Sequence, residues 1–154
     1  MSRFVYRMVR EKYANDLSGT GSALYGGRWN PKGVYVLYAS MAASLALLEW
    51  LVNATEADSE EHYYMLKLSI PDAPVLKYDL DSLPSNWRSY PPPEFLQSLG
   101  SKLVSDNQFL ALEVPSVVLP MENNLIINTR HPAFSEIKII RKEFLLLDDR
   151  MFGR

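Results

Sequence analysis

A nearly continuous apolar segment, residues 34–53, constrains the fold of this chain more than any other feature. Residues 34–39, with the sequence VYVLYA, predict a strand that is buried on both faces. Residues 41–53 are rich in Ala and Leu, so they favour a helix, and Ser40 is expected to be its N-cap. This helix is apolar nearly all round. We therefore expect it to pack inside the domain or to be covered by a partner.

Segments of strand-like composition surround this unit. Strands are expected at residues 4–9, 63–70, 75–80 and 109–114, with further extended segments at 117–119, 125–128 and 137–147. Pro92 or Pro93 can open a helix that continues to about Ser105. Residues 11–33 show little periodicity and much Gly, Ser, Asn and Asp, which predicts a long functional loop rather than a regular element. Many strands with few helices indicate an α+β domain with a mixed or antiparallel sheet.

Length and composition limit the class of protein. The chain has 154 residues, 47% of them hydrophobic and 22% charged. Chains of roughly 100–200 residues usually form one domain, so we expect residues 1–154 to be a single domain. A formal net charge of -2 gives no basic footprint, and we expect no direct nucleic-acid binding. We find neither a membrane-length apolar run nor a signal-peptide core at the start, so we expect a soluble, cytoplasmic protein away from the membrane.

The supply of metal ligands and thiols is small. The chain contains no cysteine, and its only histidines are His62 and His131. Disulfides, thiolate metal sites and a cysteine nucleophile are therefore excluded, and a reducing cytoplasm fits this composition. With so few imidazoles we expect no bound metal.

The turn at residues 26–31, with the sequence GGRWNP, is the first candidate for ligand binding. Its glycines would let backbone N–H groups approach a ligand, the Arg28 fork matches phosphate oxygens, and Pro31 stiffens the exit. The alternative is a structural turn with a surface arginine. Residues 19–24 do not form a dinucleotide fingerprint, because Leu24 occupies the position of the third glycine, and the chain has no P-loop.

Glu49 is the most informative acid, because it lies in the apolar helix. At helical spacing its face is shared by Ala42, Leu45 and Val52. A carboxylate there is either partly exposed at the helix rim or desolvated, and a desolvated carboxylate needs a partner. Arg7 and Arg28 precede it. An arginine with a carboxylate suits cleavage of a charged glycosidic bond, since the arginine holds phosphates and the carboxylate stabilises an oxocarbenium-like transition state.

Other polar and aromatic residues have two possible roles each. Tyr35 and Tyr38 point to opposite faces of their strand, and either could stack on a flat ring or simply belong to the core. Arg7 shares a face with two valines, so it either extends to the surface or meets an anion. Ser116 lacks the context of a serine nucleophile. The asparagines of the ENN segment, Asn124 included, could bind ribose hydroxyls, but a turn is the preferred reading for them and for Asn128.

Several motifs together resemble the RES-domain family. They are Tyr6-Arg7, Asp16-Leu17-Ser18-Gly19, Gly26-Gly27-Arg28-Trp29-Asn30, Tyr38-Ala39-Ser40, Glu49, Val114-Pro115-Ser116, Glu122-Asn123-Asn124-Leu125-Ile126-Ile127-Asn128 and His131-Pro132. The family is named for Arg, Glu and Ser, which match Arg28, Glu49 and Ser116. The similarity runs over nearly the whole chain. Thr129 departs from the pattern, since many relatives have proline there, and we expect this to alter a turn only.

The resemblance implies an ADP-ribosyltransferase-like fold and the toxin of a bacterial toxin-antitoxin system, restrained by a helix-turn-helix, Xre-like antitoxin. It implies NAD⁺ as substrate, with the nicotinamide-ribose bond cleaved by phosphate or water. The alternatives are a mono-ADP-ribosyltransferase that modifies a cellular protein, and a catalytically silent binding module. A homodimer is also compatible. The expected roles are pyrophosphate binding by Arg28 and Arg7, cation stabilisation by Glu49, positioning of nicotinamide or ribose by Tyr38, and orienting hydrogen bonds from Ser116 and Asn124.

Overall fold

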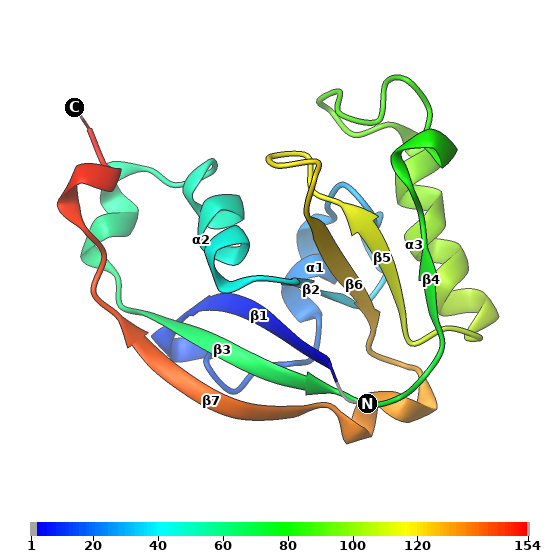
Figure 1. Ribbon diagram of the computed structural model, residues 1–154, viewed down its shortest axis with the longest axis horizontal. Coiled ribbons are helices and arrows are strands. Elements are labelled where there is room, and N and C mark those ends of the chain that lie inside the picture. The colour runs from blue at the N-terminus through cyan, green and yellow to red at the C-terminus, as the bar shows by residue number, and fades with distance from the viewer. Residues whose placement is uncertain (1–2, 154) are drawn as a thin grey trace.

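Seven strands form one twisted sheet in the order β4-β5-β6-β2-β1-β3-β7 (Figure 1). The computed structural model describes residues 3–153. The strands are β1 (Arg3–Arg10), β2 (Val36–Ser40), β3 (Tyr63–Ile70), β4 (Val75–Lys77), β5 (Ala111–Pro115), β6 (Asn123–Asn128) and β7 (Lys138–Leu145). The pair β4-β5 is parallel and the other neighbouring pairs are antiparallel. The predicted α+β fold with a mixed sheet is therefore confirmed.

Within residues 3–153, three α-helices and four short 3-10 helices connect the strands, and a fifth 3-10 helix follows β7. The α-helices are α1 (Thr20–Tyr25), α2 (Ala43–Leu51) and α3 (Glu94–Asp106). The 3-10 helices are η1 (Glu11–Tyr13), η2 (Glu56–Glu60), η3 (Leu80–Ser82), η4 (Pro132–Glu136) and η5 (Asp149–Met151). The helix predicted to open at Pro92 or Pro93 is confirmed, because Pro93 is the N-cap of α3.

Helices α2 and α3 lie on the same face of the sheet. Leu96 and Leu103 of α3 pack in one core cluster with Ile126 of β6. Asn124, two residues earlier and on the same face of β6, donates a hydrogen bond to Glu49 of α2. In Figure 1 the two helices stand apart over the sheet. The sheet surface between them is therefore the place to look for a site.

The opposite face of the sheet carries the second core cluster. Val5, Leu66 and Leu125 are fully buried there, at 0% exposure. The cover comes from irregular segments rather than from α-helices: its members are Ala14, Leu17, Ala133, Phe134 and Ile137. The long stretch after β1 thus contributes to the core as well as to surface loops.

The pairing between β1 and β2 is short. Only Tyr6 and Ser40 are partners there, whereas β1 pairs with β3 along eight residues, from Arg3 to Arg10. Figure 1 shows β1, β3 and β7 turning away from β4, β5 and β6. The sheet therefore opens beside the end of β2, on the side where α2 packs against β1 and β2.

The N-cap prediction for Ser40 is wrong. Ser40 is the last residue of β2, because it still pairs with Asn124 of β6. Helix α2 begins two residues after Met41, with Ala42 as an N-cap that makes no side-chain hydrogen bond, and ends at Leu51. The apolar composition predicted the helix correctly, but β2 continues through Ser40, although serine often begins a helix as its N-cap.

Burial of α2 differs from the expectation of a fully packed helix. Leu45 and Ala46 are its buried residues, and Val52, at the C-cap, is 57% exposed. The helix thus packs along one side only. That a partner protein covers the more exposed side of α2 stays a prediction.

Three other predicted segments differ from the structure. Residues 11–33 include α1, whose ends are set by Gly19 and Gly26 with positive φ angles of 75° and 70°. The strand expected at 75–80 ends at Lys77 and is followed by η3. Residues 117–119 form a turn between β5 and β6 rather than a strand.

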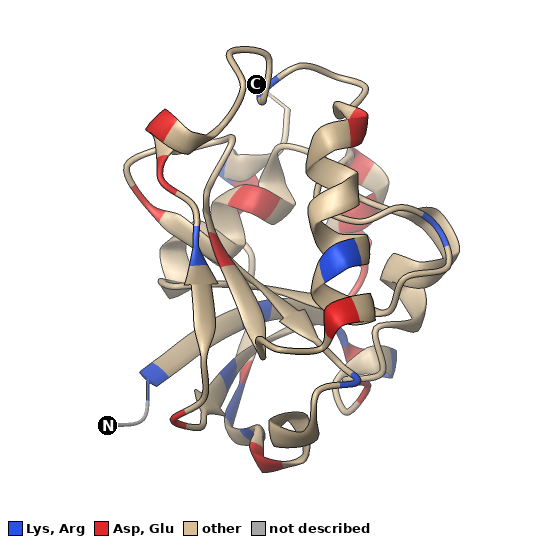
Figure 2. Ribbon diagram, turned by 90° about the vertical axis from the view of Figure 1, so that its right-hand side faces the viewer, with Lys and Arg blue, Asp and Glu red and all other residues tan. Residues whose placement is uncertain are grey.

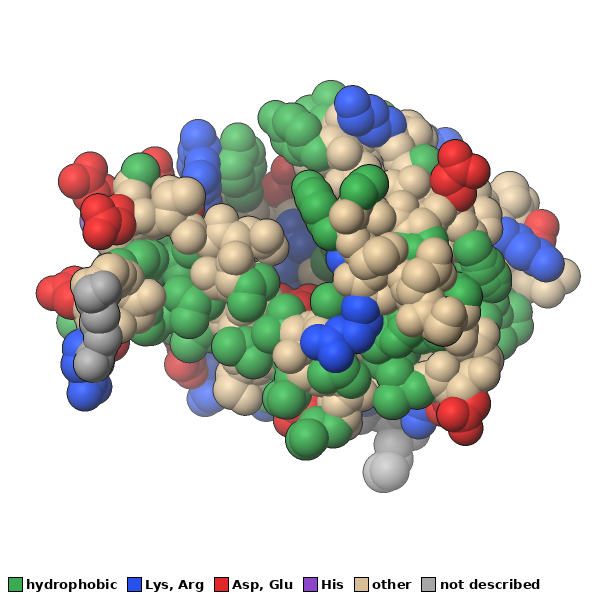
Figure 3. Space-filling model, turned by 90° about the horizontal axis from the view of Figure 1, so that it is seen from above, with side chains coloured by type: hydrophobic (Ala, Val, Ile, Leu, Met, Phe, Trp, Pro, Cys, Tyr) green, Lys and Arg blue, Asp and Glu red, His purple; other side chains and the backbone are tan. Residues whose placement is uncertain are grey.

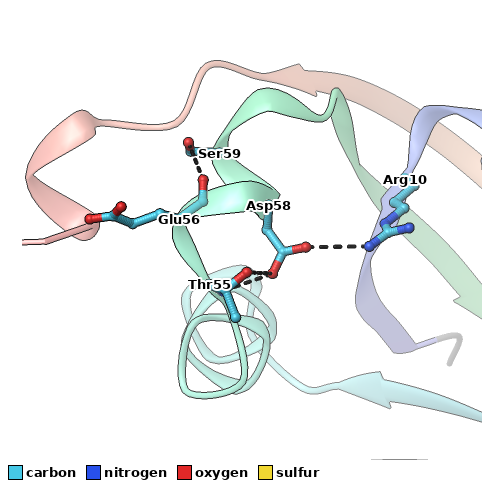
Figure 4. A network of polar contacts seen from close by, with 5 residues as sticks. All are labelled: Arg10, Thr55, Glu56, Asp58 and Ser59. Atoms are coloured by element: carbon cyan, nitrogen blue, oxygen red, sulfur yellow. Dashed lines mark hydrogen bonds and ion pairs between the residues drawn. The ribbon is translucent and has the colours of Figure 1, made fainter.

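The segment after α2 is tied back to β1 by a polar network (Figure 4). Thr55 and Asp58 form a capping box at η2, and the backbone N–H of Thr55 holds the pKa of Asp58 below its usual value. Arg10 Nη2 lies 3.3 Å from Asp58 Oδ1. This contact connects the end of β1 to the connection between α2 and β3.

Charged residues of both signs are spread over the surface. Figure 2 shows acidic residues near both ends of α3 with a basic residue between them. Within residues 3–153, no helix is long and apolar enough to cross a membrane. The same part of the chain contains no group of three or more His, Cys, Asp or Glu residues that could hold a metal ion.

The contact between α3 and the turn before β2 yields a stability prediction. A Cβ at Gly100 would lie 2.0 Å from the backbone oxygen of Trp29. We expect Gly100→Ala to lower the free energy of unfolding by about 1–3 kcal/mol through overpacking, although alanine favours helix. Urea denaturation measures the change.

The matched control is Gly21→Ala in α1, where an added Cβ meets nothing within 4 Å. This variant is expected to gain up to about 1 kcal/mol from helix propensity. If Gly100→Ala were as stable as Gly21→Ala, the close packing of α3 against the Trp29 backbone would be contradicted.

Candidate active site

A cleft of about 650 Å³ opens between α2 and α3. It is lined from β1, β2, β6 and both helices, and also by residues 25–29, 90–92 and 117–118. Seen from above in Figure 3, a hollow separates the two sides of the molecule, with basic and acidic side chains in and beside it. Its volume lies within the range of about 300–1,000 Å³ that is usual for ligand sites.

Glu49 is held in this cleft by two neutral donors. Asn124 Nδ2 donates to Glu49 Oε2 at 2.8 Å, and Ser116 Oγ donates to Glu49 Oε1 at 3.2 Å. Among residues 3–153, no ion pair involves Glu49. The Glu49 side chain is therefore oriented by hydrogen bonds from neutral groups and not by an ion pair within the described residues.

Ser116 supports Glu49 from behind the cleft. The residue is fully buried, at 0% exposure, and its neighbours Val117 and Val118 line the cleft while Ser116 does not. Its hydroxyl oxygen accepts the backbone N–H groups of Val118 and Leu119, both at 3.1 Å. Since a hydroxyl has one proton, that proton goes to Glu49. This geometry supports an orienting role rather than attack by a serine nucleophile.

Tyr38, not Tyr35, lines the cleft. The Tyr38 hydroxyl donates to Asn30 Oδ1 and accepts the backbone N–H of Trp29 at 3.2 Å. Burial raises the pKa of Tyr38, so the phenol is neutral at physiological pH. Tyr35 instead lies under the Arg130 guanidinium, 5.1 Å from ring centroid to the guanidinium carbon.

The GGRWNP turn positions its arginine without offering its glycine N–H groups. Gly26 N–H donates to Ser22 O at 2.8 Å and Gly27 N–H to Asn30 O at 2.9 Å, so the expectation that they approach a ligand is wrong. Gly27 is needed for a different reason, because a Cβ there would lie 2.6 Å from the Tyr38 hydroxyl. The Asn30 carboxamide is fully buried and closes the turn.

Arg28 extends from this turn along the mouth of the cleft. Its Nη1 donates to the carbonyl oxygens of Trp87 and Ser89 at 2.9 and 2.8 Å. Desolvation lowers the pKa of Arg28, and the charge of Glu49 opposes that effect. Within the described chain, Nε and Nη2 of Arg28 make no hydrogen bond. They remain available to an anionic ligand.

Arg7 occupies the opening between β1 and β2. Its Nη1 donates to Tyr38 O at 2.9 Å, and its Nε is buried without a hydrogen-bond partner among residues 3–153. Burial lowers the pKa of Arg7, and the charge of Asp16 opposes this effect. A buried N–H without an acceptor is costly, which favours a site where a ligand oxygen can accept from it.

The preferred turn reading is wrong for the asparagines of β6. Asn124 binds Glu49, and Asn128 is fully buried and donates to Asn107 Oδ1 at 2.8 Å. Sequence reasoning also missed Ser40, Tyr6 and Gln97, which line the cleft. Gln97 Nε2 donates to Gly27 O at 3.0 Å. Tyr6 and Ser40 stand in motifs of the family resemblance but were given no role in the site, and the place of Gln97 depends on helix docking, which the sequence does not display.

The Tyr38 hydroxyl yields a prediction about stability and pH. Tyr38→Phe leaves the Trp29 N–H and the side-chain amide oxygen of Asn30 without their Tyr38 partner, and is expected to lower the free energy of unfolding by about 1–3 kcal/mol near pH 7. The raised pKa adds a pH effect. Above pH 10.0, the usual value, the unfolded tyrosine ionises while the folded one keeps its proton, so wild-type stability falls as pH rises. Tyr38→Phe is expected to show a shallower fall in urea denaturation between pH 9 and about pH 11.

Tyr35→Phe is the matched control, because no hydrogen bond of the Tyr35 hydroxyl exists within residues 3–153. Its stability and pH dependence are expected to follow wild type. Equal behaviour of the two variants would contradict the structural role of the Tyr38 hydroxyl.

The chain is similar to known proteins over nearly its whole length. The sequence model of the RES domain matches residues 4–149. Toxin Res of Yersinia enterocolitica is 36% identical over 131 residues, which cover 84% of this chain and 86% of that protein. Toxin Res of Photorhabdus laumondii is 34% identical and covers 96% of both chains. The Prs ADP-ribosylating toxin of a Sphingobium species is 35% identical, covering 95% of this chain and 92% of its own.

A solved structure shares the fold. The crystal structure of the M. tuberculosis MbcT-MbcA toxin-antitoxin complex contains a chain that superposes with a TM-score of 0.74, covering 94% of this chain and 85% of that one. At 19% identity this likeness shows the fold alone. The match to the family's sequence model over nearly the whole chain, together with relatives more than 30% identical, shows that this chain belongs to the RES-domain family.

Proposed function

We propose that this chain is the toxin of a toxin-antitoxin system and degrades NAD⁺ by cleaving the nicotinamide-ribose bond. The observation that carries the proposal is a single cleft lined by the Glu49 carboxylate, two guanidinium groups and the Tyr38 ring. The names of the relatives, which are toxins, support the biological part. The name of the Sphingobium relative, an ADP-ribosylating toxin, supports chemistry at the same bond.

The proposed step breaks the bond between the nicotinamide nitrogen and ribose C1′. The electron pair of that bond leaves with nicotinamide, whose ring becomes neutral, and positive charge develops on the ribose. Glu49 stabilises this charge because its carboxylate lies in the cleft and is held there by Ser116 and Asn124, and it forms no ion pair among residues 3–153. An oxygen nucleophile then forms the new bond to C1′ and loses its proton.

Arg28 and Arg7 are proposed to hold the pyrophosphate. Both line the cleft, and each has N–H groups that make no hydrogen bond within the described chain. Guanidinium donors suit phosphate oxygens better than ammonium groups do, because of their planar fork. The ring of Tyr38 would lie beside nicotinamide or ribose, and its neutral hydroxyl stays with Asn30.

The acceptor is proposed to be phosphate or water, which makes the chain an NAD⁺ phosphorylase or glycohydrolase. A mono-ADP-ribosyltransferase is the second candidate, supported by the name of the Sphingobium relative. We further propose that the chemistry needs no metal, since Glu49 and the arginines supply the charges that the transition state requires.

Partners and place of action follow from the same proposal. We propose a helix-turn-helix, Xre-like antitoxin, because the structural neighbour comes from a toxin-antitoxin complex. Exposed apolar residues at the cleft, Tyr25 at 78%, Tyr90 at 88% and Val52 at 57%, offer a surface to a protein partner or a second copy. We also propose that the protein acts in the cytoplasm and that residues 1–154 form one functional domain.

The first test is nicotinamide release from NAD⁺ by the purified protein, with and without phosphate. Wild type is expected to release nicotinamide with EDTA present. Glu49→Gln is expected to lose about 100-fold or more in kcat, because a neutral amide cannot stabilise the ribosyl cation. Absence of nicotinamide release by wild type in every buffer would overturn NAD⁺ phosphorolysis and hydrolysis, and would leave the ADP-ribosyltransferase, whose protein acceptor this assay lacks, and the silent binding module.

Folding of Glu49→Gln is checked by circular dichroism and urea denaturation. Lys102→Gln, an exposed charge change on α3 outside the cleft, is the control and is expected to keep wild-type turnover. Wild-type activity in Glu49→Gln would show that the carboxylate is not catalytic.

The second test follows the ADP-ribose group. With NAD⁺ labelled in the adenine part, phosphorolysis yields ADP-ribose-1″-phosphate and hydrolysis yields ADP-ribose, whereas protein modification leaves the label bound to protein after denaturing gel separation. We expect the label in small products when the protein acts in cell lysate. Label retained by one lysate protein at the expense of free products would establish the ADP-ribosyltransferase alternative.

A further inference from the structure

We propose that Ser40 is a positioning residue for this site, which acts by fixing the side-chain amide of Asn124 so that its Nδ2 faces Glu49. The consequence for turnover rests on the proposed function. The positioning itself rests on hydrogen bonds among buried groups and can be measured without a substrate.

Ser40 is placed by the sheet where three strands meet. It pairs with Asn124 of β6 on one side and with Tyr6 of β1 on the other. Directly opposed residues point to the same face, so the Ser40 hydroxyl and the Asn124 amide are neighbours. Ser40 Oγ lies 2.7 Å from Asn124 Oδ1, and the two residues are only 4% and 8% exposed.

The direction of every proton in this chain of hydrogen bonds is determined by chemistry. An ionised carboxylate only accepts, so the Asn124 group that faces Glu49 must be the NH₂. The amide oxygen therefore faces Ser40, and because this oxygen only accepts, the Ser40 hydroxyl must donate to it. Glu49 thus binds the NH₂ end of the Asn124 amide, and Ser40 holds its oxygen end.

Loss of the Ser40 hydroxyl would remove one of the two contacts that hold the Asn124 amide. The Asn124 oxygen would be buried without its donor, and the amide could shift away from the position in which its Nδ2 donates to Glu49. Glu49 would then be held less firmly and would depend more on Ser116. Small displacements of a catalytic group reduce turnover strongly, so we expect a loss in kcat on the order of ten-fold with little change in KM.

A double-mutant cycle separates this role from direct substrate contact, which is the other possibility for a residue that lines the cleft. We expect Ser40→Ala and Asn124→Ala each to lower kcat for nicotinamide release, and the double variant to match Asn124→Ala. Ser40→Thr keeps the hydroxyl and is expected to recover most of the kcat. Additive losses in the double variant, or wild-type kcat in Ser40→Ala, would overturn the proposal.

The control for removal of a strand hydroxyl is Ser69→Ala in β3, outside the cleft, which is expected to keep wild-type kcat. Ser40→Cys, with a similar shape and a weaker donor, replaces Ser40→Ala in the cycle if the alanine variant does not fold.

A second measurement does not depend on NAD⁺ chemistry. In ¹⁵N-labelled protein, the side-chain NH₂ resonances of Asn124 are identified by their loss in Asn124→Ala. Their exchange with solvent is expected to accelerate at least several-fold in Ser40→Ala and to return toward wild type in Ser40→Thr. Unchanged shifts and exchange in Ser40→Ala would overturn the positioning role. If wild type released no nicotinamide, this result would still decide the inference separately from the proposed function.

Discussion

The arrangement of the site depends on one carboxylate that receives hydrogen bonds from two neutral side chains. Glu49 lies on a helix that packs along one side only, and its orientation comes from Ser116 after β5 and Asn124 in β6. Neutral donors hold a carboxylate in place and leave its charge available, whereas an arginine in contact would neutralise it. The site therefore depends on two features. The arginines lie in the same cleft as Glu49, and within residues 3–153 they form no ion pair with it.

The second constraint is the short pairing between β1 and β2. Where the ladder ends, Arg7 on β1 reaches the carbonyl oxygen of Tyr38 and takes the place of a strand partner. The Arg7 guanidinium therefore donates a hydrogen bond to the backbone of β2 and also lines the cleft. This explains how an arginine that shares a strand face with buried valines can also line a polar site.

Much of the fold was visible in the sequence, because apolar periodicity reports burial directly. The strands near residues 4–9 and 63–70 and the helix with Glu49 were found in this way. The partners of Glu49 were not, since Ser116 and Asn124 are 67 and 75 positions away and meet it only through strand order and register. Ser40 and the N–H groups of Gly26 and Gly27 were misread for a related reason: local chemistry assigned them to a helix cap and to a ligand, while the folded chain uses them in long-range or internal hydrogen bonds. The residue types in the sequence indicated the chemistry, but strand order and register determine which residues contact Glu49.

The hydrogen bonds from Arg28 to the carbonyl oxygens of Trp87 and Ser89 have a thermodynamic consequence. A free arginine side chain has many rotamers, and fixing one on binding costs up to about 2 kcal/mol in conformational entropy. Here the guanidinium is already restrained in the folded chain, and its Nε and Nη2 make no hydrogen bond to residues 3–153. That ordering accompanies folding rather than association, so an anion at the cleft mouth meets a rigid receptor.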